Sequence, residues 1–192
     1  EQMKDLSSDM TELTRVVLSG VERTTKIIKG LKVFSNPSEV IPDEPVLDVR
    51  DAVEGAITIM MSKIKEHGVE LKYELKETPL IRGNGAMISQ VITNIIDNAI
   101  DALASVPTPR TIELKTFTEG DHVIISVRDN GPGIPAEHQS MILNPFFTTK
   151  EVGKGTGLGL SISFSIVKKH NGSLEFVSSP GHGTEFKIKI PV

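Results

Sequence analysis

The sequence predicts a two-layer α/β sandwich, in which three helices cover one face of a mixed β-sheet and a long N-terminal helix precedes both layers. Apolar and charged residues alternate over LKYELK (71–76) and TEFKIKI (184–190), which is the pattern of strands with one buried face. Apolar residues recur with a helical period over residues 51–66, 85–104 and 158–170. One-sided strands and one-sided helices must bury their apolar faces against each other, and this produces two layers.

The N-terminal segment is predicted to be one long helix that spans residues 1–36. An apolar seam at alternating steps of three and four residues indicates packing against a second copy of the chain or a segment outside it. The seam consists of Leu6, Met10, Leu13, Val17, Gly20, Thr24, Ile27, Leu31 and Phe34. The segment SNPSEVIPDEP (35–45) holds three prolines, which end a helix. Residues 37–44 are therefore interpreted as a linker and residues 45–192 as the main domain.

A β-hairpin is predicted in the middle of the main domain. IELKT (112–116) and VIISVRD (123–129) both have the two-residue period of strands, and Gly120-Asp121 supplies the turn between them. A chain of 192 residues with 38% apolar content is long enough to bury one substantial core.

The composition argues against several classes of protein. The net charge of −4 disfavours a nucleic-acid binder, because such proteins present a basic surface to phosphates. The absence of cysteine excludes disulfides and thiolate metal sites, and a cytoplasmic location is expected. No apolar run approaches the roughly 20 residues that cross a bilayer. No membrane contact is expected in this chain, so any membrane attachment of the full-length protein would lie outside it.

Polar residues form a stripe on the helix predicted after Asn84. Gln90, Asn94, Asn98 and Asp101 follow one another at steps of four, four and three, so they share one face of this helix. The opposite face is apolar and comprises Ile88, Val91, Ile92, Ile95, Ala99 and Leu103. The stripe is consistent with a solvated face, or with a site if other motifs converge on it.

Asp129 is predicted to point toward the buried side of the sheet. The period of two sends it to the same side as Val123, Ile125 and Val127. A buried carboxylate needs a donor, and an adenine amino group is a suitable one. The alternative is an Asp that caps the following turn. In DNGPGIP, which begins at Asp129, two glycines allow the backbone to approach a flat ligand closely.

The segment GKGTGLGLSIS (153–163) is a glycine-rich loop that leads directly into a helix. Its free N–H groups and the helix N-terminus suit a di- or triphosphate. It has neither the spacing of a P-loop nor the preceding strand of a dinucleotide fingerprint. A flexible loop without a ligand is the alternative for this motif taken alone.

The ordered combination of motifs is more specific than any one of them. Asn94 and Asn98 are followed by DNGPGIP, then NPFFTTK (144–150), GTGLGL (155–160) and GHGTEF (181–186). Over residues 45–192 the chain resembles the catalytic ATP-binding domain of sensor histidine kinases of two-component systems, with the N, G1, F and G2 boxes in order. This resemblance implies the Bergerat (GHKL) ATP-binding fold, which agrees with the predicted layers. NAIDA together with PFFTTK resembles the nitrogen-sensor-like branch.

The resemblance implies a role for each motif residue. Asn98 would bind the Mg²⁺ that bridges the ATP phosphates, with Asn94 assisting, and Asp129 would receive the adenine amino group, supported by Thr184. The residues from about Pro135 to Gly155 would form a lid anchored by Phe146 and Phe147. The remaining nucleotide contacts would come from two glycine-rich segments, namely Gly131, Gly133 and Ile134 at the adenine, and Gly155, Thr156, Gly157, Leu158 and Gly159 at the phosphates.

One position departs from the family pattern. Many members carry a lysine or arginine three residues after the second asparagine, whereas this chain carries Asp101. Lys150, which is also predicted to act in catalysis, and Lys154 are the candidates for the cation that meets the phosphates. A solvated loop charge is the alternative for each lysine.

The acceptor histidine of such kinases is not found in this chain. The first histidine is His67, and TTKIIKGLKVFS (24–35) resembles the end of the second helix of the dimerisation hairpin. The chain is therefore expected to bind ATP without phosphorylating itself. Its partners would be the phosphoacceptor helix of the same kinase, a receiver domain of a response regulator and a second copy. The five histidines are interpreted as surface or helix-end residues: His67, His122, His138, His170 and His182.

Two other functions are open. ATP hydrolases of the same fold place a glutamate four residues before the metal-binding asparagine, where it serves as a general base for water. Here Asn94 occupies that position, and an amide cannot accept the proton. The second alternative is a degenerate kinase that serves as a nucleotide-binding regulatory module.

Overall fold

The computed structural model describes residues 45–151 and 155–192, together with nine helical residues of the N-terminal segment. These nine are Met10, Leu13, Thr14, Val17, Gly20, Val21, Thr24, Thr25 and Ile28. The rest of the predicted N-terminal helix, the predicted linker at 37–44 and Lys154 lie outside the described residues. Within the described part of the chain, no helix is both long and apolar enough to cross a membrane.

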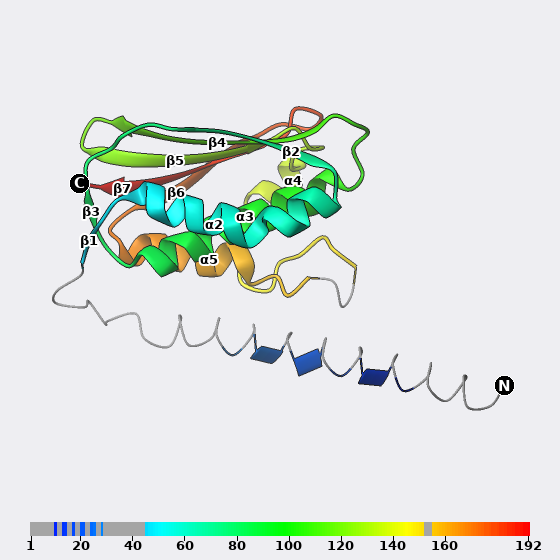
Figure 1. Cartoon of the computed structure of the whole chain (residues 1–192). Helices are drawn as coiled ribbons and strands as arrows, with labels where there is room; N and C mark the ends of the chain where they lie inside the picture. The colour runs from blue at the N-terminus through cyan, green and yellow to red at the C-terminus, as the bar shows by residue number, and fades with distance from the viewer. Residues whose placement is uncertain are drawn as a thin grey trace.

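The main domain contains the predicted mixed sheet (Figure 1). In spatial order its strands are β2 (Val69–Leu75), β4 (Arg110–Glu119), β5 (His122–Asp129), β7 (Thr184–Pro191) and β6 (Ser173–Ser178). The pair β2 and β4 is parallel, and the other neighbours are antiparallel. The predicted hairpin is β4 and β5, which places the end of β5 beside the start of β7, where Asp129 pairs with Thr184.

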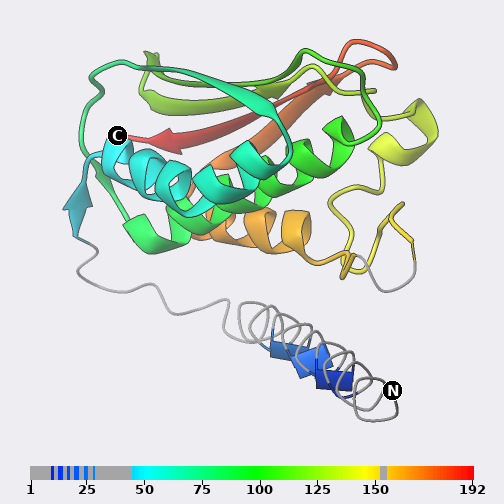
Figure 2. The same ribbon diagram turned by 45° about the vertical axis from the view of Figure 1, so that its right-hand side comes forward.

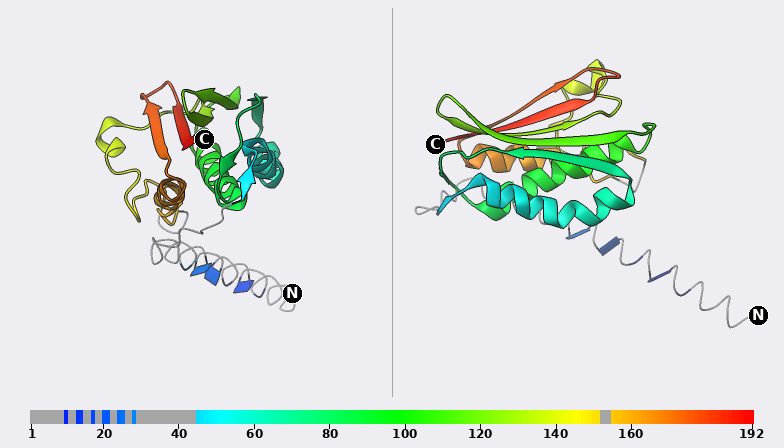
Figure 3. Two further views of the ribbon diagram at one scale, coloured as in Figure 1. Left: turned by 90° about the vertical axis from the view of Figure 1, so that its left-hand side faces the viewer. Right: turned by 45° about the horizontal axis from the view of Figure 1, so that its top comes forward.

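Three helices cover one face of the sheet, as the sequence predicted (Figures 2 and 3). They are α2 (Val49–Glu66), α3 (Gly85–Leu103) and α5 (Gly159–Lys169). The N-cap of α3 is Asn84, whose side chain accepts a hydrogen bond from the N–H of Met87 at 3.1 Å. Because α3 lies between α2 and α5 and contacts both, it is the most deeply buried helix.

The core lies between α3 and the inner face of the sheet. All six apolar residues that the sequence predicted for α3 are buried, and so is the inner row of β5. The largest fully buried side chains include Ile88, Ile92, Ile95, Ile96, Ile100, Leu103, Ile112, Leu114 and Ile125. This packing fixes α3 rigidly with respect to the sheet, because a close-packed interior leaves little room for displacement.

Four elements were not predicted. The edge strand β6 was missed because its apolar pattern is weak: Leu174 is buried, whereas Val177 is exposed. The strands β1 (Val46–Leu47) and β3 (Ile81–Arg82) form a separate pair of two residues each, too short to show a period. The one-turn helix α4 (Ala136–Gln139) lies inside the predicted lid.

His170 links α5 to the start of α3. It is the C-cap of α5, as predicted for a helix-end residue, but it is 4% exposed and so does not belong to the surface. Its Nε2 accepts a hydrogen bond from the N–H of Asn84 at 3.0 Å, and its Nδ1 lies 2.8 Å from the carbonyl oxygen of Ile166. These two partners require a neutral ring with the proton on Nδ1.

Candidate functional site

Asp129 is held at the inner end of β5 by backbone donors. Its carboxylate is nearly buried, and Oδ1 accepts hydrogen bonds from the N–H groups of Gly131 at 2.8 Å and Thr184 at 3.3 Å. Burial raises the pKa of the Asp129 carboxyl, and these two N–H groups only partly oppose that rise. Among the described residues no donor contacts Oδ2, so this oxygen can accept a hydrogen bond from a ligand.

Two glycines keep the backbone close to this carboxylate. A methyl group on Gly131 would lie 2.7 Å from Asp129 Oδ1. Gly133 has a φ of 73°, and a Cβ there would lie 2.1 Å from the carbonyl oxygen of Ser179. Since neither position accepts a side chain, both glycines are required by the shape of the backbone. Ile134 follows them, and its N–H donates to Ser178 Oγ at 2.8 Å.

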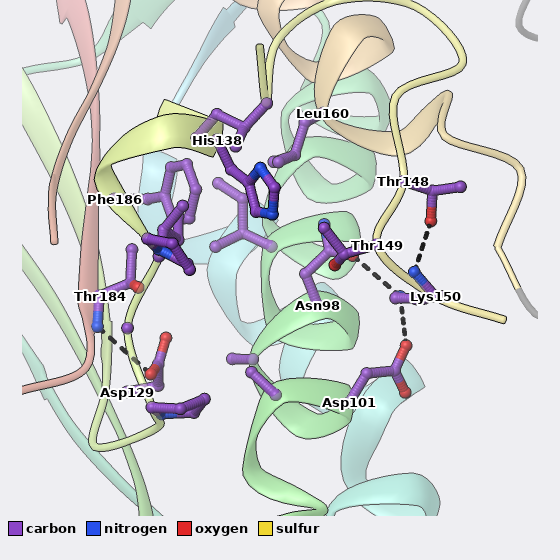
Figure 4. A pocket seen from close by; sticks show the side chains of 18 of the residues that line it. Asn98, Asp101, Asp129, His138, Thr148, Thr149, Lys150, Leu160, Thr184 and Phe186 are labelled. Carbon is purple, nitrogen blue, oxygen red and sulfur yellow. Dashed lines mark hydrogen bonds and ion pairs between the residues drawn. The ribbon is translucent and has the colours of Figure 1, made fainter. Parts of the chain in front are cut away.

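A cavity of about 330 Å³ begins at Asp129 and extends to the lid (Figure 4). Apolar side chains of α3, β7 and the lid form most of its wall, including Ile95, Ala99, Ile134, Ile142, Phe147, Leu160 and Phe186. Its polar groups include Asp129 and Thr184 at one side and Asn98, Asp101 and Lys150 at the other. A concave apolar cavity with a few convergent polar groups is the typical form of a small-ligand site.

The predicted phosphate loop lies beside this cavity. A second depression of about 1160 Å³ shares Asn98, Asp101 and Lys150 with it and is lined by residues 155–159. The start of α5 has no side-chain cap, so N–H groups of its first turn are available to an anion. Gly157 has a φ of 65°, and a Cβ there would lie 2.4 Å from the carbonyl carbon of Phe146.

Asn94 and Asn98 have different surroundings. The Nδ2 of Asn94 donates to the carbonyl oxygen of Gly159 and to Ser163 Oγ, both at 3.2 Å, which ties α3 to the start of α5. The Oδ1 of Asn98 instead accepts a hydrogen bond from Lys150 Nζ at 3.2 Å. Asn94 therefore ties α3 to α5 beside the predicted phosphate loop, whereas Asn98 faces the cavity.

A network of charges surrounds Asn98. Lys150 forms an ion pair with Asp101 Oδ2, and Lys63 of α2 reaches Asp97 Oδ1 at 2.5 Å and Asp101 Oδ1 at 3.3 Å. Burial opposes ionisation of Asp101, but Lys150 and Lys63 outweigh it and hold the pKa of this carboxyl below its ordinary value. Desolvation likewise opposes the charge on Lys63, and its aspartate partners outweigh it, so the pKa of Lys63 is raised.

Three residues of the site were missed by sequence reasoning. Lys63 and Asp97 line the depression beside residues 155–159, which is called the phosphate depression below. His138 of α4 lines the cavity that begins at Asp129. The His138 ring meets Phe147 edge to face at 5.6 Å, and within the described chain its buried Nδ1 has no hydrogen-bond partner. His138 is the third residue of the one-turn helix α4 and is neither its last residue nor its cap, and its side chain lines the cavity.

The predicted lid anchor is half correct. Phe147 packs against the core, whereas Phe146 is 61% exposed. Phe146 has a φ of 67°, and its N–H donates to the carbonyl oxygen of Gly157 at 2.9 Å. This backbone turn directs the Phe146 side chain away from the core, so of the two phenylalanines only Phe147 packs against it.

The fold and the site define an ATP-binding domain of the Bergerat type. The family model for histidine kinase-, DNA gyrase B- and HSP90-like ATPases matches residues 83–192. The chain belongs to this family. Membership of this family supports ATP as the nucleotide that the domain uses.

The similar proteins are sensor kinases. The sensor kinase CckA of Brucella abortus is 32% identical over 91% of the chain and 20% of its own length. Sporulation kinase C of Bacillus subtilis is 30% identical over 99% of the chain and 43% of its own length. The solved catalytic domain of histidine kinase ThkA is 28% identical with a TM-score of 0.67, covering 78% of this chain and 97% of that domain. The chain thus spans less than half of the curated relatives it matches. The nitrogen-sensor-like branch stays a prediction.

Proposed function

We propose that this chain is the phosphoryl-donating domain of a sensor histidine kinase. It binds Mg²⁺ and ATP and presents the γ-phosphate to a histidine of a dimerisation helix, from which the phosphoryl group passes to an aspartate of a response regulator. The names of the relatives support this reading, since CckA and sporulation kinase C are both kinases. A cytoplasmic location is part of this proposal, because the reaction draws on the ATP pool of the cell.

The observation that carries the proposal is the absence of a free general base among the described residues at the phosphate end. Asn94 is an amide whose nitrogen is bound to α5, and an amide cannot take a proton from water. The carboxylates that line this depression are Asp97, Asp101 and Glu151; the two aspartates are paired with lysine, and Glu151 also has an interaction partner. Phosphoryl transfer depends mainly on positioning and charge neutralisation, which amides and lysines supply.

The nucleotide is proposed to lie along the cavity. Asp129 Oδ2 accepts the adenine amino group, and Gly131, Gly133 and Ile134 shape the pocket around the ring. Gly155 to Gly159 bind phosphates through backbone N–H groups, while Thr184 holds Asp129 in place. The lid lysines, Lys150 and Lys154, supply positive charge.

The residues present fit a Mg²⁺ ion. Asn98 turns an amide oxygen toward the phosphate depression, and Mg²⁺ takes oxygen ligands from one or two side chains together with substrate phosphates. No three histidine, cysteine, aspartate or glutamate side chains of the described residues converge on a metal, so the phosphates must provide further ligands. When bound, the ion neutralises phosphate charge.

Dimerisation is proposed through the N-terminal segment. The described residues Met10, Leu13, Val17, Val21 and Ile28 are helical, and each side chain is exposed by at least 58%. An exposed row of apolar side chains on a helix indicates a partner surface, and a second copy of this helix fits it.

The proposal is tested by transfer in trans. The chain is mixed with ATP labelled on the γ-phosphate and with a separate protein that bears the dimerisation hairpin and its histidine, and acid-labile phosphohistidine is measured. A hairpin with that histidine changed to glutamine is the matched control. Labelled phosphohistidine only on the intact hairpin is expected. ATP binding without transfer would point to a regulatory module, and phosphate release without the hairpin would point to a hydrolase.

A further inference from the structure

The ammonium group of Lys150 lies between two oxygens of α3. This group donates a hydrogen bond to Asn98 Oδ1 at 3.2 Å and forms an ion pair with Asp101 Oδ2 (Figure 4). Asn98 and Asp101 are three residues apart, so their side chains project from the same face of the helix. One amide oxygen and one carboxylate oxygen therefore converge on a single positive charge at the phosphate end of the cavity.

These two oxygens have the chemistry of a magnesium site. Mg²⁺ prefers hard oxygen ligands and is usually held by one or two carboxylates, several waters and substrate phosphates. The Asp101 carboxylate forms ion pairs with two lysines: Lys150 at Oδ2, and Lys63 of the neighbouring helix α2 at its other oxygen, Oδ1. Oδ2 can thus exchange its partner while Lys63 keeps the carboxylate in place.

The charge balance of the site requires such an exchange. Lys63 and Lys150 carry two positive charges and Asp97 and Asp101 two negative charges, so the network is neutral before nucleotide enters. A triphosphate that draws Lys150 away would leave the Asp101 carboxylate facing phosphate oxygens, and like charges repel strongly in a partly buried site. A divalent cation at the position of the ammonium removes this repulsion.

We infer that Asp101 is a second protein ligand of the nucleotide-bound Mg²⁺. Asp101 Oδ2 and Asn98 Oδ1 bind the ion in exchange for the Lys150 ammonium group, which moves to the phosphates. The inference rests on the proposed function, because it concerns the metal that accompanies ATP at this site. It also gives a role to the acidic residue at the position where many family members carry a cation.

The test compares Asp101→Asn with Asp97→Asn in the full 192-residue chain. The two variants lose the same charge from the same helix and share the partner Lys63, but Asp97 contacts neither Lys150 nor Asn98 among the printed interactions of the described chain. ADP affinity is measured by calorimetry in EDTA and over a series of Mg²⁺ concentrations. Mn²⁺ replaces Mg²⁺ in a parallel titration, in which electron paramagnetic resonance counts the bound ion directly.

Loss of a metal ligand is expected to raise the Mg²⁺ or Mn²⁺ concentration at half saturation by about tenfold in Asp101→Asn. Asp97→Asn is expected to change it by less than about twofold, since its effect is confined to Lys63. In EDTA, Asp101→Asn should bind ADP at least as tightly as the wild type because a negative charge near the phosphates is removed. Asp101→Glu, which keeps a carboxylate, should recover part of the metal affinity.

Three results would overturn the assignment of Asp101. They are an unchanged metal dependence in Asp101→Asn, equal shifts in both aspartate variants, and a wild type that binds ADP equally well with and without divalent ion. Circular dichroism and thermal unfolding of each variant show whether it is folded. A wild type that binds no adenine nucleotide under any condition would instead refute the proposed function, so the two failures are distinguishable.

Discussion

Replacing Asp129 with asparagine tests where adenine binds. The substitution keeps an oxygen for the N–H groups of Gly131 and Thr184, which now meet at Oδ1, and it converts Oδ2 into an NH₂ group. The pocket side of residue 129 thereby changes from a charged acceptor to a neutral donor. A donor that faces the adenine amino group can make no hydrogen bond with it.

The expected loss follows from the strength of one charge-assisted hydrogen bond. Such a bond to a buried charged group contributes about 2 kcal/mol, which corresponds to roughly 30-fold in affinity. We expect ADP to bind about 30-fold more weakly to Asp129→Asn in calorimetry. Inosine diphosphate presents a carbonyl oxygen in place of the amino group, so the variant should bind it relatively better than the wild type does.

Comparing ADP with inosine diphosphate separates the loss of adenine recognition from a general distortion of the pocket. A distorted pocket would weaken both nucleotides by the same factor and leave the preference for adenine unchanged. Equal losses for ADP and inosine diphosphate, or an unchanged affinity for ADP, would refute the placement of adenine at Asp129.

Further predictions concern pH, the metal and the helix junction. Because burial raises the pKa of Asp129 in the folded state, the folded protein retains a proton that the unfolded chain has already lost. The associated stability is complete below the unfolded pKa and is lost as the pH rises through the folded pKa, and Asp129→Asn should remove this slope in denaturation series at different pH. ADP affinity should instead fall as the pH is lowered, because acid protonates Asp129 and removes the acceptor for the adenine amino group. Asn98→Asp adds a negative charge at the proposed metal site. It should reduce transfer to the hairpin histidine by about 10- to 100-fold, while the affinity for ADP changes less. A variant that still transfers phosphate at the wild-type rate would contradict the role of Asn98 as a metal ligand. His170→Ala leaves the N–H of Asn84 unpaired and opens a cavity. The free energy of unfolding should therefore fall by about 2–4 kcal/mol. The control His182→Ala removes an exposed side chain and should change it by less than about 0.5 kcal/mol.

The parts of the fold that follow from local periodicity were predictable. The apolar period of α3 identified its buried face, and the two-residue period of β5 placed Asp129 on the inner side. The strand β6 has a weaker signal, because among its six residues Leu174 is buried whereas the apolar Val177 is exposed. Phe146 was misjudged because its exposure depends on a positive φ, which no periodicity reveals.

The partners of Asp101 could not be found by such reasoning. Lys63 is 38 residues away in the sequence, and it meets Asp101 only because α2 packs beside α3. Lys150 was a candidate from its motif, but its pairing with Asp101 depends on the path of the lid. Sequence patterns show which face of an element is buried, whereas contacts across elements depend on which elements become neighbours.

The position of Asp101 explains how this chain can omit a basic residue on α3 and still bind a triphosphate. A fixed cation on α3 would attract phosphates directly, but here α3 carries the acceptors Asn98 and Asp101, and the described cations next to them come from α2 and the lid. Nucleotide binding then depends on a cation that replaces the Lys150 ammonium between those acceptors. The affinity for nucleotide should consequently depend more steeply on Mg²⁺ than in a homologue with a basic residue at that position, because there the protein itself provides the charge. A single substitution, Asp101→Lys, should make nucleotide binding nearly independent of Mg²⁺, whereas transfer, which requires the metal on the phosphates, should still depend on Mg²⁺.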